Sequence, residues 1–120
     1  MGAAIVVLIL SVASLADAQP RARKPRPPKM MRMMATAYCD RGPTKSGVSA
    51  QRGVVAADTR RLPLGTRLRI VAPGQPYAGT YTVLDTGSEI KGRDLDIFMP
   101  SCRTAKRFGK RPVQVQILLR

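Results

Sequence analysis

The apolar residues of this chain come in short runs, and turn residues separate each run from the next. Several runs are rich in valine, threonine or tyrosine, which favour strands, and the intervening segments contain glycine and proline. We expect strands at 35–39, 54–57, 67–71, 80–84, 95–99 and 113–119. One short helix is expected within residues 101–109, with Gly109 at its end. This pattern predicts an all-β fold, a small barrel of about six strands with at most one or two short helices.

The first 18 residues predict a signal peptide that is not part of this fold. Residues 3–15 are apolar or small throughout, which is too short a stretch to span a bilayer but suits the core of a signal peptide. Ala16, Asp17 and Ala18 supply a small-x-small cleavage pattern, so Gln19 would begin the mature chain. An uncleaved anchor or a misassigned start codon is the alternative. We therefore expect an exported protein in the periplasm, in the cell wall or outside the cell.

Residues 19–34 form a basic segment rich in proline and methionine. Its prolines prevent a helix and favour an extended, hydrated and disordered chain. We expect a solvated linker, or alternatively a tether that binds anionic envelope polymers through its charge. The methionines at its end are expected to start the first strand or to pack on the barrel. The predicted division is a signal peptide at 1–18, this tail at 19–34 and a barrel domain at 35–120.

The strong positive charge of the chain indicates a polyanionic partner. There are 21 lysines and arginines against 7 acids, a formal net charge of +14, and loss of Asp17 with the signal peptide would raise it by one. Outside the membrane, the available polyanions are wall polymers, lipopolysaccharide and anionic lipids. Aromatic residues make up only 4% of the chain and tryptophan is absent, which argues against base stacking. We expect no nucleic acid partner, and we expect a monomer.

The absence of histidine excludes several kinds of active site. A cysteine–histidine pair, a serine–histidine–aspartate triad and a histidine-ligated zinc site all require that residue. Acid–base chemistry must therefore use carboxylates, tyrosine, lysine or cysteine. We expect no cofactor and no catalytic metal.

Two cysteines, Cys39 and Cys102, are available for a disulfide. In an oxidising compartment they could close a loop of about 63 residues, worth roughly 4 kcal/mol in the chain-entropy model. We favour this disulfide because the domain is small. Two separate buried thiols are the alternative.

Residues 84–98, which read LDTGSEIKGRDLDIF, contain two aspartates in strand-like surroundings. Asp85 follows the apolar run 81–84, and Asp96 lies between Leu95 and Ile97. A turn-rich, glycine-containing loop separates the two acids. A strand, a loop and a second strand arranged in this way can bring two carboxyl groups close together.

Several motifs, in their order along the chain, resemble the 3D domain family, which is named for three aspartates. They are T-A-Y-C at 36–39, T-x-S-G at 44–47, G-V-V-A-x-D at 53–58, L-P-L-G-T at 62–66, D-T-G-x-x-I-K-G at 85–92 and L-D-I-F at 95–98. The resemblance covers about residues 35–119. A lone D-T-G would not be specific, but several motifs in the right order are. The family includes the catalytic barrel of a membrane-bound lytic transglycosylase and muralytic proteins of stationary phase.

The resemblance implies a six-stranded double-psi β-barrel in which Asp58, Asp85 and Asp96 are the three signature acids. Asp96 matches the catalytic acid and base of the family, and Asp85 and Asp58 match its supporting acids. The implied reaction is cleavage of the β-1,4 bond between N-acetylmuramic acid and N-acetylglucosamine, with formation of a 1,6-anhydro sugar. Peptidoglycan glycan strands are therefore the expected substrate.

The residues themselves are compatible with these roles. A general acid must keep its proton at neutral pH, so its pKa must rise well above about 3.9. Burial and a nearby like charge both raise the pKa of a carboxyl group, and Asp96 could have both if Asp85 lies beside it. The alternatives are that Asp58 only caps a turn and that Asp85 only orders its loop through hydrogen bonds.

A set of loop residues is expected to bind the saccharide or to stabilise developing charge. They are Thr44, Ser46, Gly47, Thr86, Gly87, Ser88 and Lys91. Thr44 and Ser46 could equally serve only to form their loop, and Lys91 could be solvated. Tyr38 is expected to be a core residue rather than a catalytic one. The family loop commonly reads D-T-G-G-A-I-K-G, and serine at position 88 would be strained only if its φ were positive.

A second function, from another class, also fits the chain. The barrel and its positive charge could bind wall glycan without cutting it, as expansin-like and rare-lipoprotein-A-like barrels suggest. The alternative to the enzyme is therefore a non-catalytic wall-binding module.

Overall fold

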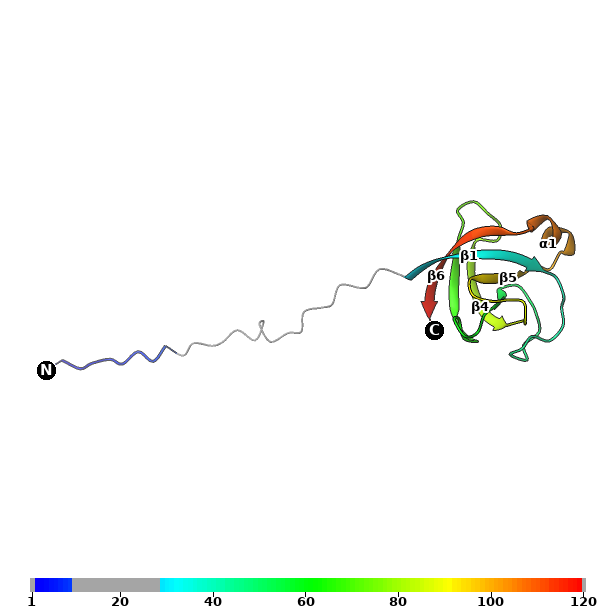
Figure 1. The fold of residues 1–120 in the computed structure, drawn as a ribbon. Helices are drawn as coiled ribbons and strands as arrows, with labels where there is room; N and C mark the ends of the chain where they lie inside the picture. The colour runs from blue at the N-terminus through cyan, green and yellow to red at the C-terminus, as the bar shows by residue number, and fades with distance from the viewer. Residues whose placement is uncertain (1, 10–28, 120) are drawn as a thin grey trace.

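The computed structural model describes residues 2–9 and 29–119 (Figure 1). Residues 2–9 contain no helix or strand. The remainder of the predicted signal peptide and residues 19–28 of the predicted tail lie outside the described residues. Within the described ranges, no helix combines the length and apolar character that crossing a membrane requires.

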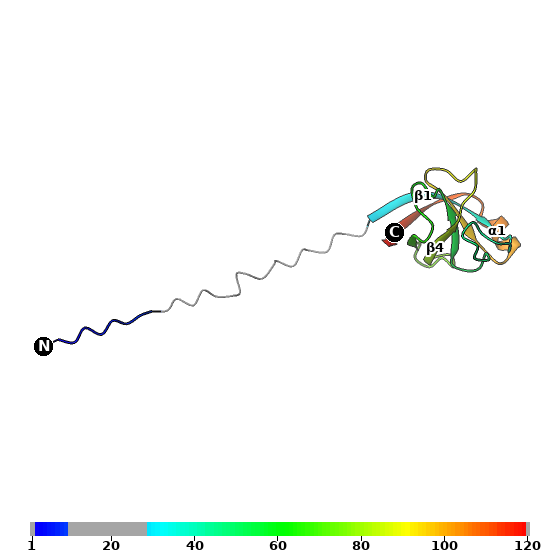
Figure 2. The ribbon, with the colours of Figure 1, turned by 90° about the horizontal axis from the view of Figure 1, so that it is seen from below.

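Residues 29–119 contain six strands and one short helix, and the strands close into a barrel (Figures 1 and 2). The elements are β1 (Lys29–Tyr38), β2 (Val54–Ala57), β3 (Arg67–Val71), β4 (Gly79–Asp85), β5 (Asp94–Phe98), α1 (Cys102–Phe108) and β6 (Arg111–Leu119). The strand order around the barrel is β1-β5-β2-β4-β3-β6. The β1–β5 and β2–β4 pairs are parallel and the other four are antiparallel. The predicted six-stranded all-β barrel is confirmed.

Most elements lie where the sequence pattern predicts them. The strands β2 and β3 have the predicted bounds, and β4, β5 and β6 differ by one or two residues. The helix α1 begins after Ser101, whose side chain accepts a hydrogen bond from the Thr104 N–H at 3.2 Å. It ends at Gly109, where φ is 65°, a value that glycine adopts without strain.

The strand β1 begins at Lys29 rather than at residue 35, and this corrects the predicted boundary between tail and barrel. Residues 29–35 pair with β6, from Lys29 opposite Ile117 to Ala35 opposite Arg111. Burial alternates along this half of β1, because Met31 and Met33 face the core while Arg32 is exposed. The expectation that the methionines start the first strand is confirmed.

The barrel interior is filled by aliphatic side chains from all six strands. They include Met33, Ala35, Val55, Ala57, Leu68, Ile70, Val83, Leu95, Ile97, Val113 and Val115. A smaller cluster of Ala50, Val54 and Phe98, with Tyr38 and Leu84 packed against it, lies apart from this core. Since side chains alternate across a strand, residues next to core residues in β1, β2 and β5 point to the outer face of the barrel.

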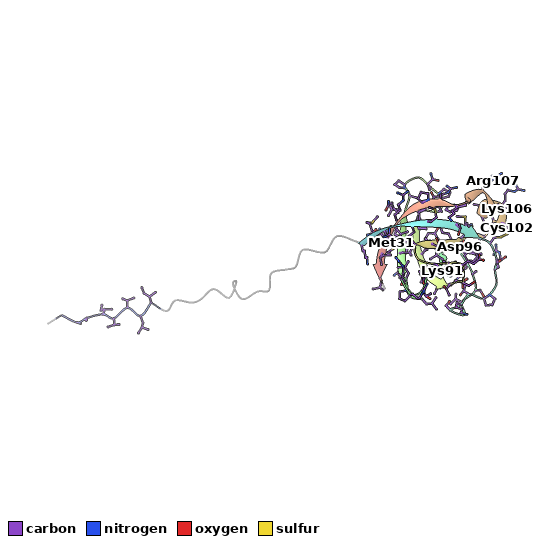
Figure 3. The ribbon with its side chains drawn as sticks, viewed as in Figure 1. Met31, Lys91, Asp96, Cys102, Lys106 and Arg107 are labelled. Carbon is purple, nitrogen blue, oxygen red and sulfur yellow. A yellow bond between two sulfur atoms is a disulfide. The ribbon has the colours of Figure 1, made fainter. Side chains whose placement is uncertain are left out.

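The disulfide between Cys39 and Cys102 is confirmed. It joins the residue after β1 to the first residue of α1, so the helix is fixed to the barrel wall (Figure 3). It closes a loop with a sequence separation of 63 residues, for which the chain-entropy model gives roughly 4 kcal/mol.

Candidate active site

A row of residues crosses four strands on the outer face of the barrel. Thr36 of β1 lies opposite Asp96 of β5, Asp96 lies opposite Ala56 of β2, and Ala56 lies opposite Asp85 of β4. Directly opposed residues project their side chains to the same face of a sheet. Two strand spacings of about 4.8 Å place the Cα atoms of Asp85 and Asp96 roughly 10 Å apart. The two acids therefore share one wall, and Ala56, with its single methyl group, forms the floor between them.

Asp85 and Asp96 lie on the same face, but not because their two strands pair with each other through the loop that joins them. Their strands β4 and β5 are not neighbours, because β2 lies between them. A register shift between Val55 and Ala56 leaves Leu84 as an extra residue in β4, since Val55 pairs with Val83 and Ala56 pairs with Asp85. A one-residue slip moves a side chain to the opposite face of a sheet. This bulge is therefore what turns Asp85 outward into the row.

The side chain of Asp96, which Figure 3 labels, is half-buried and has one hydrogen-bond partner in the described chain. The Thr36 hydroxyl Oγ1 donates to Asp96 Oδ1 at 2.9 Å. Burial raises the pKa of Asp96, the hydrogen bond from Thr36 lowers it, and the charge of Asp85 raises it further, so that the pKa lies above its ordinary value. Asp96 is thus the acid of the row whose surroundings favour the protonated form.

Asp85 is also half-buried, and backbone groups hold its side chain in place. Its Oδ1 accepts from the Lys45 N–H at 3.0 Å and from the Thr86 N–H at 2.9 Å. The Ser46 N–H donates to the Leu84 carbonyl at 3.1 Å. Asp85 therefore orders its own loop and also ties the loop that follows β1 to the end of β4.

Asp58 lies outside this row and stabilises two loops. It is buried, its Oδ1 accepts from the Arg60 N–H at 3.1 Å, and its Oδ2 accepts from the Gly92 N–H at 2.8 Å. The Arg60 side chain adds an ion pair at 3.2 Å. The side-chain hydrogen bonds from Arg60, followed by that from Gly92, lower the pKa of Asp58 to about 2. The geometry is that of a cap which fixes the β4–β5 loop to the end of β2.

The predicted saccharide-binding residues fall into two groups. Thr86, Gly87, Ser88 and Lys91 line a depression of about 440 Å³ beside Asp58. That they bind saccharide stays a prediction. No non-glycine residue in the described ranges has a positive φ, so serine at position 88 is not strained.

Thr44, Ser46 and Gly47 do not line this depression. Thr44 is buried, and its hydroxyl interacts with the Ser46 hydroxyl at 2.8 Å and donates to the Val48 carbonyl. The Gly47 N–H donates to the Thr44 carbonyl at 2.9 Å. These three residues therefore form and stabilise their own loop, which was the alternative interpretation of Thr44 and Ser46.

A comparison with sequence families identifies the domain. The sequence profile of the 3D domain matches residues 53–119. This chain belongs to the 3D domain family. The family assignment agrees with the motifs in the sequence, and the matched region contains Asp58, Asp85 and Asp96.

Two proteins of Bacillus subtilis strain 168 are similar to this 3D domain chain. YabE, whose name describes a cell wall shaping protein, is 34% identical over 100 residues, which cover 75% of this chain and 23% of YabE. The cell wall-binding protein YocH is 31% identical over 99 residues, which cover 75% of this chain and 33% of YocH. The chain thus spans about a quarter to a third of the length of these relatives.

The 3D barrel is also similar to solved structures of MltA from Escherichia coli. One, described as a lytic transglycosylase fold, aligns with a TM-score of 0.52 and 25% identity over 65% of this chain and 27% of MltA. A structure of MltA with bound chitohexaose aligns with a TM-score of 0.53 and 24% identity over 65% of this chain and 28% of MltA. The barrel therefore has the fold of one part of MltA.

Thr36 and Tyr38 lie beside the two acids, although the sequence patterns predict neither as a site residue. Tyr38 packs edge-on against Phe98, with ring centroids 5.5 Å apart, in the smaller of the two hydrophobic clusters, which agrees with its expected place among core residues. Its buried hydroxyl has no hydrogen-bond partner among the described residues. Burial and the charges of Asp85 and Asp96 raise its pKa. Alternation along β1 places Tyr38 on the same face as Thr36, and this spacing is the signal that could have revealed both.

Proposed function

We propose that this 3D domain protein is a cell wall-active enzyme that cleaves peptidoglycan glycan strands as a lytic transglycosylase does. The observation that supports this most directly is the outward-facing row in which Asp96, with a raised pKa, stands across Ala56 from Asp85. The family assignment and the MltA-like fold support the same reaction class, and the cell wall names of the relatives support the wall as its target.

In the proposed mechanism Asp96 acts first as an acid and then as a base. Its carboxyl proton passes to the glycosidic oxygen as the bond from that oxygen to C1 of N-acetylmuramic acid breaks. The C6 hydroxyl of the same sugar then attacks C1, and its proton passes to the Asp96 carboxylate. The new C1–O6 bond gives the 1,6-anhydro product, Asp96 regains its proton, and no water is consumed.

Other residues of the wall would prepare this step. The negative charge of Asp85 helps Asp96 to keep its proton, and the Lys45 and Thr86 amides orient the Asp85 carboxylate. Thr36 orients Asp96 through its hydroxyl. Thr86, Ser88 and Lys91, in the depression beside Asp58, would contact the glycan. We further propose that the protein is exported, acts as a monomer, and uses its basic amino-terminal segment to bind anionic wall polymers.

Digestion of purified sacculi tests the proposed reaction. The wild-type protein should release 1,6-anhydro muropeptides, and Asp96→Asn should reduce that release at least about 100-fold, as expected for loss of a general acid. Asp40→Asn is the matched control, because Asp40 is an exposed acid outside the row. Equal release by Asp96→Asn and the wild type would refute the role of Asp96.

A binding module is the second candidate, because the relative YocH is a cell wall-binding protein. In that case the wild type, Asp96→Asn and Asp40→Asn should sediment equally with sacculi, and none should release anhydro products. Sedimentation without turnover would support the binding module and would exclude the enzyme.

A further inference from the structure

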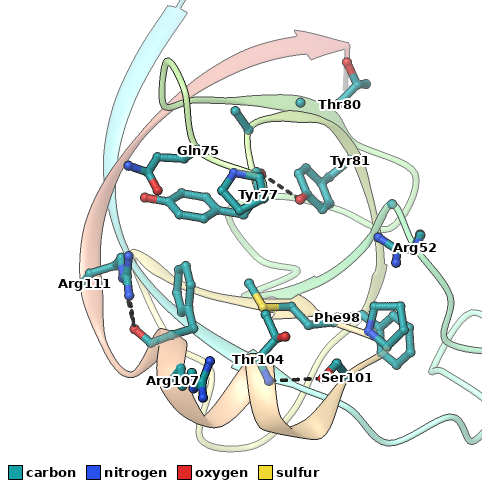
Figure 4. A pocket seen from close by; sticks show the side chains of 17 residues that line it. Arg52, Gln75, Tyr77, Thr80, Tyr81, Phe98, Ser101, Thr104, Arg107 and Arg111 are labelled. Carbon is teal, nitrogen blue, oxygen red and sulfur yellow. Dashed lines mark hydrogen bonds between the residues drawn. The ribbon is translucent and has the colours of Figure 1, made fainter.

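A second depression, of about 450 Å³, lies between α1 and the turn that joins β3 to β4 (Figure 4). Residues of β5, α1, the β3–β4 turn and the start of β6 line it. No lining residue belongs to the acid row or to the depression beside Asp58. The proposed glycan chemistry leaves this pocket unassigned.

The pocket presents positive charge without a compensating acid. Arg52, Arg107 and Arg111 line it, and none of its lining residues is an aspartate or glutamate. Arg52 and Arg107 are exposed, and neither forms an ion pair in the described chain. An anion entering the pocket would thus meet guanidinium groups that have no acidic partner.

Arg111 is held in a fixed position at one wall. Its Nε and Nη2 both donate to the Phe108 carbonyl, at 3.0 and 2.7 Å. Its guanidinium carbon lies 4.3 Å from the centre of the Phe108 ring and 5.6 Å from that of Tyr77. Two interactions of different kinds therefore orient this cation before any ligand arrives, which reduces the entropy lost on binding.

The remaining wall combines aromatic and aliphatic side chains with the polar side chains of Gln75, Thr80, Ser101 and Thr104. The Tyr77 and Phe108 rings pack edge to face with centroids 5.0 Å apart, and the Tyr81 hydroxyl donates to the Tyr77 carbonyl at 2.7 Å (Figure 4). Phe98 and Met99 complete this side. The pocket thus suits a ligand that combines small apolar groups with carboxylates.

The pocket is next to the acid row. Phe98, which lines the pocket, lies two residues after Asp96 on β5, a separation of about 7 Å along a strand, and points to the same outer face. Phe98 is only 3% exposed and packs on Tyr38, so a side branch of a ligand lying along the row would pass over this aromatic pair to reach the pocket.

We propose that this pocket binds a short acidic peptide. The forked guanidinium groups match carboxylates in geometry as well as in charge, and the aromatic wall accommodates small apolar side chains. The volume exceeds what a single inorganic anion needs. The identity of this peptide rests on the proposed function: it is the peptide that the wall glycan carries as a branch. The pocket would therefore distinguish peptide-bearing glycan from bare glycan.

Titration calorimetry on the full chain at 0.15 M salt tests this proposal without any glycan. The probe is acetyl-L-alanyl-D-glutamate, which carries two carboxylates, and its diamide is the matched ligand without charge. The wild type should bind the diacid at least about tenfold more tightly than the diamide. Arg107→Gln and Arg52→Gln should each weaken binding of the diacid several-fold.

Arg103→Gln is the matched control, because Arg103 is an exposed arginine of the same helix that does not line the pocket. This variant should bind as the wild type does. Any of three results would overturn the proposal. They are equal binding of diacid and diamide, equal losses in Arg103→Gln and Arg107→Gln, and equally tight binding of inorganic phosphate. Asp96→Asn should bind the diacid normally, so failure of the peptide site and failure of the glycan reaction give separate results.

Discussion

Asp58 and Asp96 have identical side chains, but their neighbours shift the pKa values of the two carboxyl groups in opposite directions. Asp58 accepts hydrogen bonds from Arg60 and from the Gly92 backbone, which stabilise its ionised form. Asp96 is half-buried, has a single hydroxyl donor and senses the charge of Asp85. At the residue scale, the surroundings thus separate a structural carboxylate from the proposed acid.

The raised pKa of Asp96 predicts a stability cost near neutral pH. The folded state binds this proton more tightly than the unfolded state, so the stabilisation is complete below the ordinary pKa and is lost as pH rises through the folded value. Asp96→Asn retains an oxygen for Thr36 and should be more stable than the wild type at pH 7, by about 1 kcal/mol or less. Urea denaturation at pH 7 and at pH 3 measures this. Equal stability differences at both pH values would contradict it.

Asp58 predicts the opposite pH dependence. Its pKa is lowered to about 2 in the folded state, so its contribution is present above the ordinary pKa of about 3.9 and is lost as pH falls towards 2. Asp58→Asn should lower the melting temperature at pH 7 and have little effect near pH 2. Thermal unfolding followed by circular dichroism provides the measurement. A loss that persists unchanged at pH 2 would show that Asp58 does not act through its charge.

The sequence predicts the acids themselves better than their roles. The family motifs single out Asp58, Asp85 and Asp96, and all three lie in the matched domain. The cap that Asp58 forms depends on Gly92, which is 34 residues away, and local patterns do not contain such contacts. Thr36 was overlooked for a similar reason, since its hydrogen bond to Asp96 spans 60 residues.

At the scale of elements, the barrel order rather than chain order decides which residues meet. The strand β2 is only four residues long, and it lies between β4 and β5. Its residue Ala56 has Asp85 of β4 opposite it on one side and Asp96 of β5 opposite it on the other. Runs of apolar residues predict β2 and β3 well, but they do not predict the bulge at Leu84, which depends on pairing between distant strands.

The start of β1 was missed because arginine and methionine dominate its first half. An alternating signal is nevertheless present, since Met31, Met33, Ala35 and Ala37 are apolar at every second position and contact the core. The neighbouring prolines and positive charges favoured a linker. Pairing with β6 outweighs that local preference.

This finding predicts where the amino-terminal segment can be removed. A chain that begins at Lys29 keeps the whole β1–β6 ladder, whereas one that begins at Met33 loses the pairs of residues 29–32 and the packing of Met31. The second chain should be less stable by about 1–3 kcal/mol, or at least about 5 °C in melting temperature. Calorimetry of both chains tests this. Equal melting temperatures would show that the first half of β1 contributes nothing.

On the scale of the whole molecule, one covalent bond supports a small barrel. The Cys39–Cys102 disulfide connects β1 to α1, the only helix in residues 29–119. The pairing was predictable because the sequence has only two cysteines. The position of α1 over the barrel end, which creates the arginine-lined pocket, was not, because it depends on packing of Ala105 and Phe108 into the core.

Removal of this bond should lower stability without changing the fold. The double variant Cys39→Ser/Cys102→Ser is expected to lose roughly 2–4 kcal/mol, measured by urea denaturation. Reduced wild-type protein is the control and should show the same loss. A double variant as stable as the oxidised wild type would contradict this expectation.

The seven residue pairs that join β1 to β6 also have a mechanical consequence. Hydrogen bonds in an antiparallel pair run perpendicular to the strands. Tension applied to the chain ahead of Lys29, along the direction of β1, would therefore load these bonds in shear and share the force among them. A barrel attached to a wall through that end would resist extraction more strongly than one whose strand could be peeled away bond by bond.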